Sequence, residues 1–169
     1  MDNLTHTLTG LMLSRAGLNR FTPRGNALLM IAPIAPDIDV VSLAAGPAAY
    51  LHYHRGITHS LAAIPFMALL PVLLIRLTVK GPFDWKRAWL VALAGVCSHP
   101  LLDSTNIYGI RLLLPFSGEW RSLDLTNVVD LWIWAVLLLA LLAPAISRLI
   151  TSEIGPPKTL GRGWARFAL

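Results

Sequence analysis

The segment from His54 to Ser60 places ionisable side chains directly before a long apolar run. Its sequence, His-Arg-Gly-Ile-Thr-His-Ser, supplies two histidines, an arginine and two hydroxyl groups, and residues 61–79 that follow are mostly apolar. A helix over residues 57–79 would be about 33 Å long at ~1.5 Å per residue, which is enough to cross a bilayer. The pattern therefore predicts a membrane helix with polar groups at its mouth.

The composition also indicates a membrane protein. Of the 169 residues, 55% are hydrophobic and only 14% are charged, whereas soluble domains carry roughly 25% charged residues. A chain of this length is enough for one compact domain. We expect a single membrane-embedded helical domain over residues 1–150, followed by a basic tail over 151–169.

The predicted fold is all-α: a polytopic membrane bundle of about four to five helices, some short or broken, with a metal site at one end. Prolines and aspartates interrupt the second apolar segment, which we interpret as a helix that stops partway. Glycine and proline predict a loop at 46–56, and mixed composition predicts another at 104–127. Helices are expected at 3–17, 57–79, 88–103 and 128–150, and the helix that stops partway lies within the apolar stretch 26–45.

Three further polar motifs stand at the ends of apolar segments, namely Asp2–His6, Pro36–Asp39 and His99–Asp103. His99 and Asp103 are four residues apart and so share one face of a helix. Basic residues gather at the opposite helix ends, for example in the link 76–87. The positive-inside rule places these links in the cytoplasm, so the four polar motifs should meet at the extracytoplasmic end.

Such a group of histidines and aspartates predicts a bound divalent metal. The single cysteine, Cys97, excludes a cysteine-rich zinc site. Histidine and carboxylate ligands suit zinc, with manganese or iron as alternatives, and their number allows one or two ions. The candidate ligands are His6, Asp37, Asp39, His54, His59, His99 and Asp103.

Candidate catalytic roles fall on Asp37, Asp39 and Arg55. Either aspartate could take a proton from metal-activated water. Arg55 could bind a phosphate or carboxylate of the substrate, or it could pair with one of the two aspartates. Asp124 and Asp130 could orient ligand histidines, although Asp130 also fits a carboxylate at a helix N-terminus.

Together these motifs resemble the YdjM-like family of bacterial inner-membrane proteins, assigned as metal-dependent hydrolases and in some members described as LexA-regulated. The likeness rests on the four polar motifs together with Asn106-x-Tyr108-Gly109 and Pro115-Phe116. It implies a helical, multi-pass hydrolase of the inner membrane. The order His, Asp, His, His-x-x-x-Asp is also distantly similar to zinc-dependent phospholipase C.

Three functions remain open from the sequence. The first is a metal-dependent hydrolase that acts on an ester in the membrane, with a lipid phosphoester as substrate. The second is a transporter or metal-permeation protein, because broken helices with aspartates also mark ion sites. The third is a non-catalytic scaffold with a structural metal. Nucleic acid is not expected as a partner, because the basic residues are dispersed at helix ends.

Overall fold

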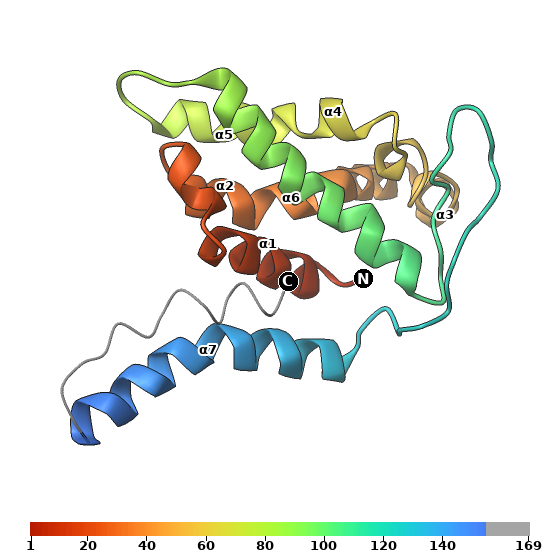
Figure 1. Ribbon diagram of the computed structural model, residues 1–169. Coiled ribbons are helices and arrows are strands. Elements are labelled where there is room, and N and C mark those ends of the chain that lie inside the picture. The colour runs from red at the N-terminus through yellow and green to blue at the C-terminus, as the bar shows by residue number, and fades with distance from the viewer. Residues whose placement is uncertain (155–169) are drawn as a thin grey trace.

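The structure is a computed structural model that describes residues 1–154. These residues form helices, joined near the C-terminal end by an irregular segment, 106–130, with two isolated β-bridges. The predicted all-α membrane bundle is therefore confirmed. Of the predicted tail over 151–169, residues 155–169 lie outside the described residues. The elements are α1 (Asn3–Arg15), η1 (Leu18–Phe21), α2 (Gly25–Ile31), η2 (Ala32–Ala45), α3 (Pro47–Tyr53), η3 (Ile57–His59), α4 (Ile64–Met67), α5 (Leu69–Thr78), α6 (Trp85–Thr105) and α7 (Leu131–Ile154), where η marks a 3₁₀ helix (Figure 1).

Two of the described helical stretches are long and apolar enough to cross a membrane, Gly25–Ala45 and Leu131–Ser152. A third span is possible if Pro47–His59 and Ile64–Thr78, which meet at an angle of 94°, count as one broken span. α6 is also 21 residues long, but its polar residues leave it outside this group. Two of these three stretches themselves carry polar motifs, because Gly25–Ala45 contains Pro36–Asp39 and the broken span contains His54–Ser60.

The sequence suggested that the helix in the second apolar segment stops partway, but this prediction was wrong: the segment stays helical throughout. α2 passes directly into η2, and the prolines change the type of helix instead of ending it. Proline lacks the backbone N–H that an α-helix needs, so Pro33 and Pro36 each leave a carbonyl without its helical donor. A 3₁₀ helix of 14 residues is unusually long, and it carries Asp37 and Asp39.

Two other sequence-based expectations were wrong. The predicted loop 46–56 contains α3, because Pro47 follows Gly46 at the first helical position, where its missing N–H costs nothing. The membrane helix predicted over 57–79 is not continuous, because the chain is broken after η3. There the Ser60 hydroxyl donates to the Ile57 carbonyl and accepts from the Ala63 N–H, which holds the chain in a turn before α4.

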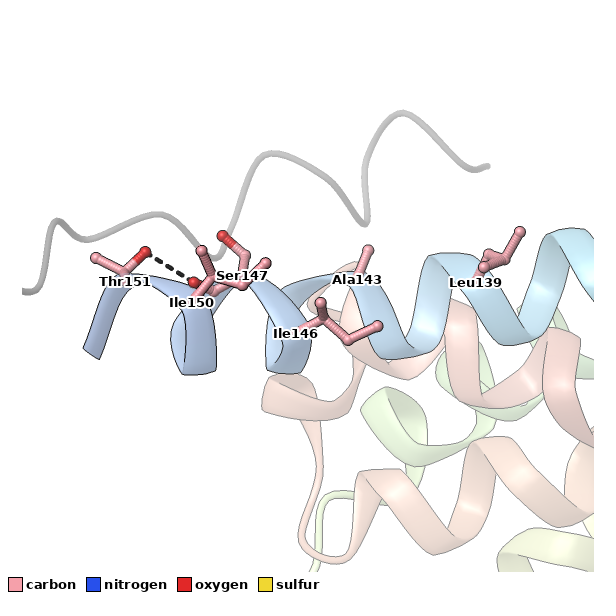
Figure 2. A pocket seen from close by; sticks show the side chains of 6 residues that line it. All are labelled: Leu139, Ala143, Ile146, Ser147, Ile150 and Thr151. Atoms are coloured by element: carbon pink, nitrogen blue, oxygen red, sulfur yellow. Dashed lines mark hydrogen bonds between the residues drawn. The ribbon is translucent and has the colours of Figure 1, made fainter. Parts of the chain in front are cut away.

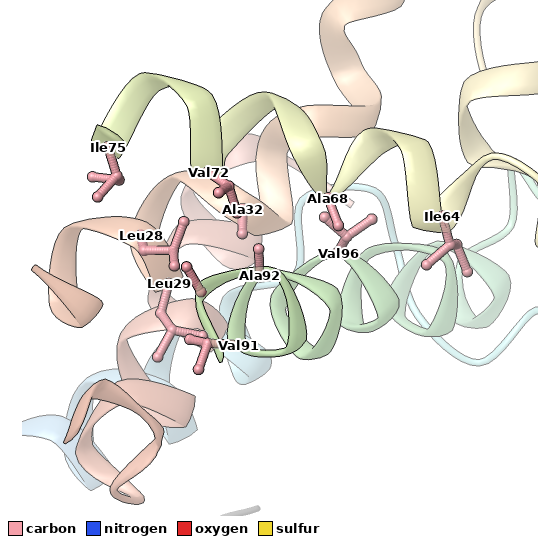
Figure 3. Packing of buried hydrophobic residues seen from close by; sticks show 11 residues of the cluster. Leu28, Leu29, Ala32, Ile64, Ala68, Val72, Ile75, Val91, Ala92 and Val96 are labelled. Carbon is pink, nitrogen blue, oxygen red and sulfur yellow. The ribbon is translucent and has the colours of Figure 1, made fainter. Parts of the chain in front are cut away.

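The main hydrophobic core lies between α2, the start of η2, α4, α5 and α6 (Figure 3). Small residues let these helices approach closely. A Cβ atom added to Gly95 of α6 would lie 2.8 Å from the Cβ of Ala32, and one added to Gly10 of α1 would lie 1.9 Å from the Leu29 carbonyl oxygen. That carbonyl is the one whose α-helical donor would be residue 33, a proline. The packing of α1 and α6 on the second segment thus depends on glycine.

The last helix packs on the outside of this bundle. α7 contacts α1 through Leu141, which is buried with Leu8 and Met12. Many of its other apolar side chains are exposed, as expected for a helix that faces lipid. One such face is drawn in Figure 2 and is lined by Leu139, Ala143, Ile146, Ser147, Ile150 and Thr151.

Candidate metal centre

Five elements of the fold meet at the polar cluster. α1 contributes its first turn, η2 its middle, α3 and η3 the ends that face one another, and α6 its last turns. The structure brings all seven candidate ligands into three overlapping groups, in each of which the possible ligand atoms lie within 4.8 Å of one another. The groups are His6, His99 and Asp103; Asp37, His59 and His99; and Asp37, Asp39 and His54.

His99 and Asp103 share one face of α6, as their spacing predicted, and both are buried. The Nδ1 of His99 lies 2.6 Å from the Pro33 carbonyl oxygen. That carbonyl is free because its 3₁₀ donor would be residue 36, another proline. Nδ1 must therefore carry the proton, and the unprotonated Nε2 faces the carboxylates.

His59 is held in the same way from the other side. The Thr58 hydroxyl donates to Oδ2 of Asp39 at 3.2 Å, and its oxygen lies 3.0 Å from Nδ1 of His59. Because the hydroxyl hydrogen points to Asp39, the proton of this second bond belongs to His59. The Nε2 atom of His59 is thus left with a lone pair, aimed at Asp37 and Asp103.

The distances between these nitrogens and the carboxylate oxygens do not fit hydrogen bonds. Nε2 of His59 lies 3.3 Å from Asp37 and 3.7 Å from Asp103, while Nε2 of His99 lies 3.6 Å and 3.5 Å from the same two side chains. Hydrogen bonds of this kind are about 2.7–3.2 Å long. Neighbouring ligands of a tetrahedral zinc ion, each about 2.0–2.1 Å from it, are about 3.3 Å apart. The spacing therefore fits ligands arranged around a cation.

His6 completes the buried side of the cluster. Its ring stacks on that of His99, with centroids 3.8 Å apart, and its Nε2 lies 3.3 Å from Oδ1 of Asp103. Among the described residues, neither ring nitrogen of His6 has a hydrogen-bond partner, and the Nε2 atoms of His59 and His99 have none either. Buried polar atoms rarely lack a hydrogen-bond partner. The unpartnered nitrogens of these three imidazoles surround two carboxylates, and this arrangement fits a metal site.

The first turn of α1 positions His6. Asp2 caps the helix by accepting the backbone N–H groups of Leu4 and Thr5, each at 3.0 Å, and the Thr5 hydroxyl at 2.6 Å. The indole N–H of Trp134 on α7 donates to the Thr5 hydroxyl oxygen at 2.9 Å. Although partial burial favours its protonated form, these hydrogen bonds hold the pKa of Asp2 below its usual value. The cap is therefore ionised near neutral pH.

Asp39 organises the outer part of the cluster. Its carboxylate accepts the Arg55 backbone N–H at 3.0 Å and lies 3.1 Å from Nδ1 of His54, in addition to the Thr58 bond. The side chain of Asp39 is buried, whereas that of Asp37 is 18% exposed and has no hydrogen-bond donor among the described residues. The two aspartates thus differ: Asp39 is held by its neighbours, and Asp37 stays accessible.

The Arg55 side chain does not pair with Asp37 or Asp39. Its Nε lies 3.4 Å from Oδ2 of Asp103, and its Nη1 donates to the Asn106 side chain at 2.9 Å and to the Gly109 carbonyl at 3.2 Å. Arg55 also adopts a φ of 55°, which is uncommon for a residue with a Cβ. The guanidinium is buried beside Asp103 and forms an ion pair with it, although its Nε has no hydrogen-bond partner among the described residues.

Residues outside the predicted ligand set also line the cluster. Thr58, Pro33 and Asn106 orient His59, His99 and Arg55, respectively. Thr58 belongs to one of the four polar motifs and Asn106 to the Asn106-x-Tyr108-Gly109 motif, but nothing in the sequence marked the Pro33 carbonyl as a histidine partner. The Met1 amino group also contacts Asp103, and burial lowers the pKa of this amine to about 5.

Two aspartates considered as partners of ligand histidines lie elsewhere. Asp130 accepts the backbone N–H groups of Trp132 and Ile133 at the start of α7, which is its alternative role. Asp124 accepts the Ser122 hydroxyl in an exposed part of the irregular segment. His52 is exposed on α3, and its ring packs edge-on against Tyr53.

The fold and the site define a helical membrane protein with buried histidine and aspartate groups that could hold a metal ion. Residues 1–166 match the protein family described as "YdjM inner membrane protein", and the chain belongs to that family. It is accordingly a protein of the inner membrane.

Two curated relatives are similar to the chain. "Uncharacterized protein YfhP" of Bacillus subtilis is 34% identical over 143 residues, which cover 79% of this chain and 43% of the relative. "Inner membrane protein YbcI" of Escherichia coli is 37% identical over 93 residues, or 53% of each chain. The chain thus spans about half the length of the curated relatives it matches. No solved structure shows significant similarity to it.

Proposed function

We propose that the protein is a metal-dependent hydrolase that cleaves an ester bond of a membrane lipid, in the first place a phosphoester. The observation that carries this proposal is the set of orphan Nε2 atoms on His6, His59 and His99, which face Asp37 and Asp103 from inside the fold. Zinc is the cation that best suits this donor set, and the seven candidate ligands are enough for one or two ions.

The charges of the cluster support a bound cation. Asp37, Asp39 and Asp103 supply three negative charges and Arg55 one positive charge, so with neutral histidines the side chains sum to −2. Unbalanced charge within a buried site is costly. One divalent cation would neutralise this sum, and a second would leave positive charge for an anionic phosphate and a hydroxide.

The chain's own residues divide the work of hydrolysis. A bound zinc would lower the pKa of a coordinated water towards ~7. Asp37, which is accessible and accepts no hydrogen bond from the described part of the chain, would take the proton of that water. Asp39 orients His54 and His59 through Thr58. Arg55 fixes Asp103 and thereby acts as a positioning residue instead of meeting the phosphate itself.

The transporter hypothesis finds less support. Among the described residues, every buried ionisable side chain belongs to this one cluster, and the buried polar side chains Ser14 and Thr22 towards the other end carry only hydroxyl groups. A conduction pathway needs polar groups along its length. The accessible side of Asp37 likewise favours an enzyme, which keeps an open position, over a closed structural metal site.

Chelation tests the proposed function directly. Purified protein in detergent should contain a divalent metal and should hydrolyse at least one member of a phospholipid panel. Treatment with EDTA should remove both the metal and the turnover, and added Zn²⁺ or Mn²⁺ should restore them, measured by elemental analysis and by phosphate or headgroup release. Protein that carries no metal, or turnover that survives complete chelation, would contradict the proposal.

We also propose that the cluster faces the extracytoplasmic side. Arg87 and His99 lie twelve residues apart on α6, about 18 Å along the helix, so the basic link before α6 is remote from the cluster. A reporter fused within the link 79–84 should therefore report the cytoplasm, and one fused within 115–120 should report the opposite side. Alkaline phosphatase and fluorescent reporters measure this, and the reverse pattern would overturn the orientation.

A further inference from the structure

An apolar pocket of about 670 Å³ adjoins the candidate metal centre. It lies between η2 and α5, which run in opposite directions, and α5 also contacts α2 (Figure 1). Within residues 1–154, the polar residues that line it are Asn3 and Asp37, and the apolar lining consists of Ile31, Ile34, Ala35, Ile38, Leu70, Pro71, Leu73, Leu74 and Leu77.

Asp37 connects the pocket to the metal centre. Its Oδ1 lies 3.3 Å from Nε2 of His59 and 3.6 Å from Nε2 of His99, yet the same side chain lines the pocket. Asn3 stands three residues before His6, at the start of the same helix. Both polar lining residues thus lie at the end of the pocket that meets the metal centre, and the remainder is hydrocarbon.

The apolar wall is long and faces outward. Leu70, Leu73, Leu74 and Leu77 follow the spacing of one helix face over about 10 Å of α5. Leu73, Leu74 and Leu77 are each at least half exposed. Because α5 belongs to a candidate membrane span, these side chains would face lipid. The volume of the pocket falls in the range of sites that hold small molecules, about 300–1,000 Å³.

We propose that this pocket holds one hydrocarbon chain of a membrane lipid, with the polar head of that lipid at Asp37. A molecule that is apolar along its length and polar at one end matches the lining, whereas a helix from a partner or a second copy would need no polar terminus next to the metal centre. This inference rests on the proposed function and names its substrate class: a lipid held by its chain while the bond near its head is cleaved.

Photolabelling tests the pocket independently of turnover. The protein is placed in vesicles of phosphatidylethanolamine and phosphatidylglycerol that contain a trace of phosphatidylglycerol with a diazirine in its acyl chain. Labelled peptides should concentrate on residues 31–38 and 70–77. Leu73→Trp, which fills the pocket, should lower labelling of residues 31–38 about tenfold, the change that about 1.4 kcal/mol of lost affinity produces.

Leu90→Trp on α6 is the matched control, because Leu90 is 48% exposed against 50% for Leu73 and does not line the pocket. It should leave the labelling unchanged. Even labelling of all lipid-facing helices, or cross-links between two copies through this face, would overturn the inference. Concentrated labelling without hydrolysis of any lipid would sustain the pocket and refute the proposed function. Lipid hydrolysis that continues unchanged in Leu73→Trp would sustain the proposed function and refute the pocket.

Discussion

His99→Ala should abolish both metal binding and lipid hydrolysis. The His99 ring is buried, belongs to two of the three ligand groups and has its Nδ1 fixed on the Pro33 carbonyl. Loss of a residue that only orients a ligand typically costs about 10–100-fold in metal affinity, so loss of the ligand itself should cost more than about 100-fold. Elemental analysis of the purified protein and turnover of the lipid cleaved by the wild type measure the two effects.

His52→Ala is the matched control for this substitution. His52 is exposed on α3 and belongs to none of the ligand groups, so its removal should leave metal content and turnover at wild-type values. Metal-free His99→Ala should also melt close to the metal-free wild type within a few degrees. Retention of a full complement of metal by His99→Ala would refute the site, and equal losses in both variants would show that the metal has another origin.

The sequence allowed the gathering of the polar motifs to be predicted because each stands at the end of an apolar segment. Ionisable side chains are costly in a bilayer, and helices that alternate in direction bring their ends together. In the structure, all seven candidate ligands lie in one cluster of three overlapping groups. Their role as ligands stays a prediction, which the metal content of the purified protein tests.

The details that escaped the sequence depend on single backbone groups. Prolines at positions 33 and 36 were interpreted as helix breaks, yet they convert the segment to a 3₁₀ helix and free the carbonyl that orients His99. Arg55 was expected either to bind a phosphate or carboxylate of the substrate or to pair with Asp37 or Asp39. Its left-handed backbone conformation instead turns the side chain to Asp103, a contact that no spacing rule predicts.

Asp103→Ala should destabilise the fold far more than Asp37→Ala. Asp103 is buried and contacts Arg55, His6, His59 and His99. Removing one partner of a buried ion pair leaves the other charge uncompensated, which typically costs about 3–5 kcal/mol. Asp37 contacts only histidines among the described residues and is partly exposed, so its loss should remove metal and turnover with little change in the metal-free melting temperature.

A double variant separates the buried charge from other causes of instability. If Asp103→Ala is unstable because Arg55 is left unpaired, then Arg55→Met combined with Asp103→Leu should recover part of the lost stability, since replacing both members of a buried pair by apolar residues is often neutral or stabilising. Thermal melts in detergent with EDTA compare the wild type, Asp103→Ala, Asp37→Ala and the double variant without a contribution from bound metal. A double variant no more stable than Asp103→Ala, or equal melting of Asp103→Ala and Asp37→Ala, would show that the Arg55–Asp103 pair does not hold the cluster together.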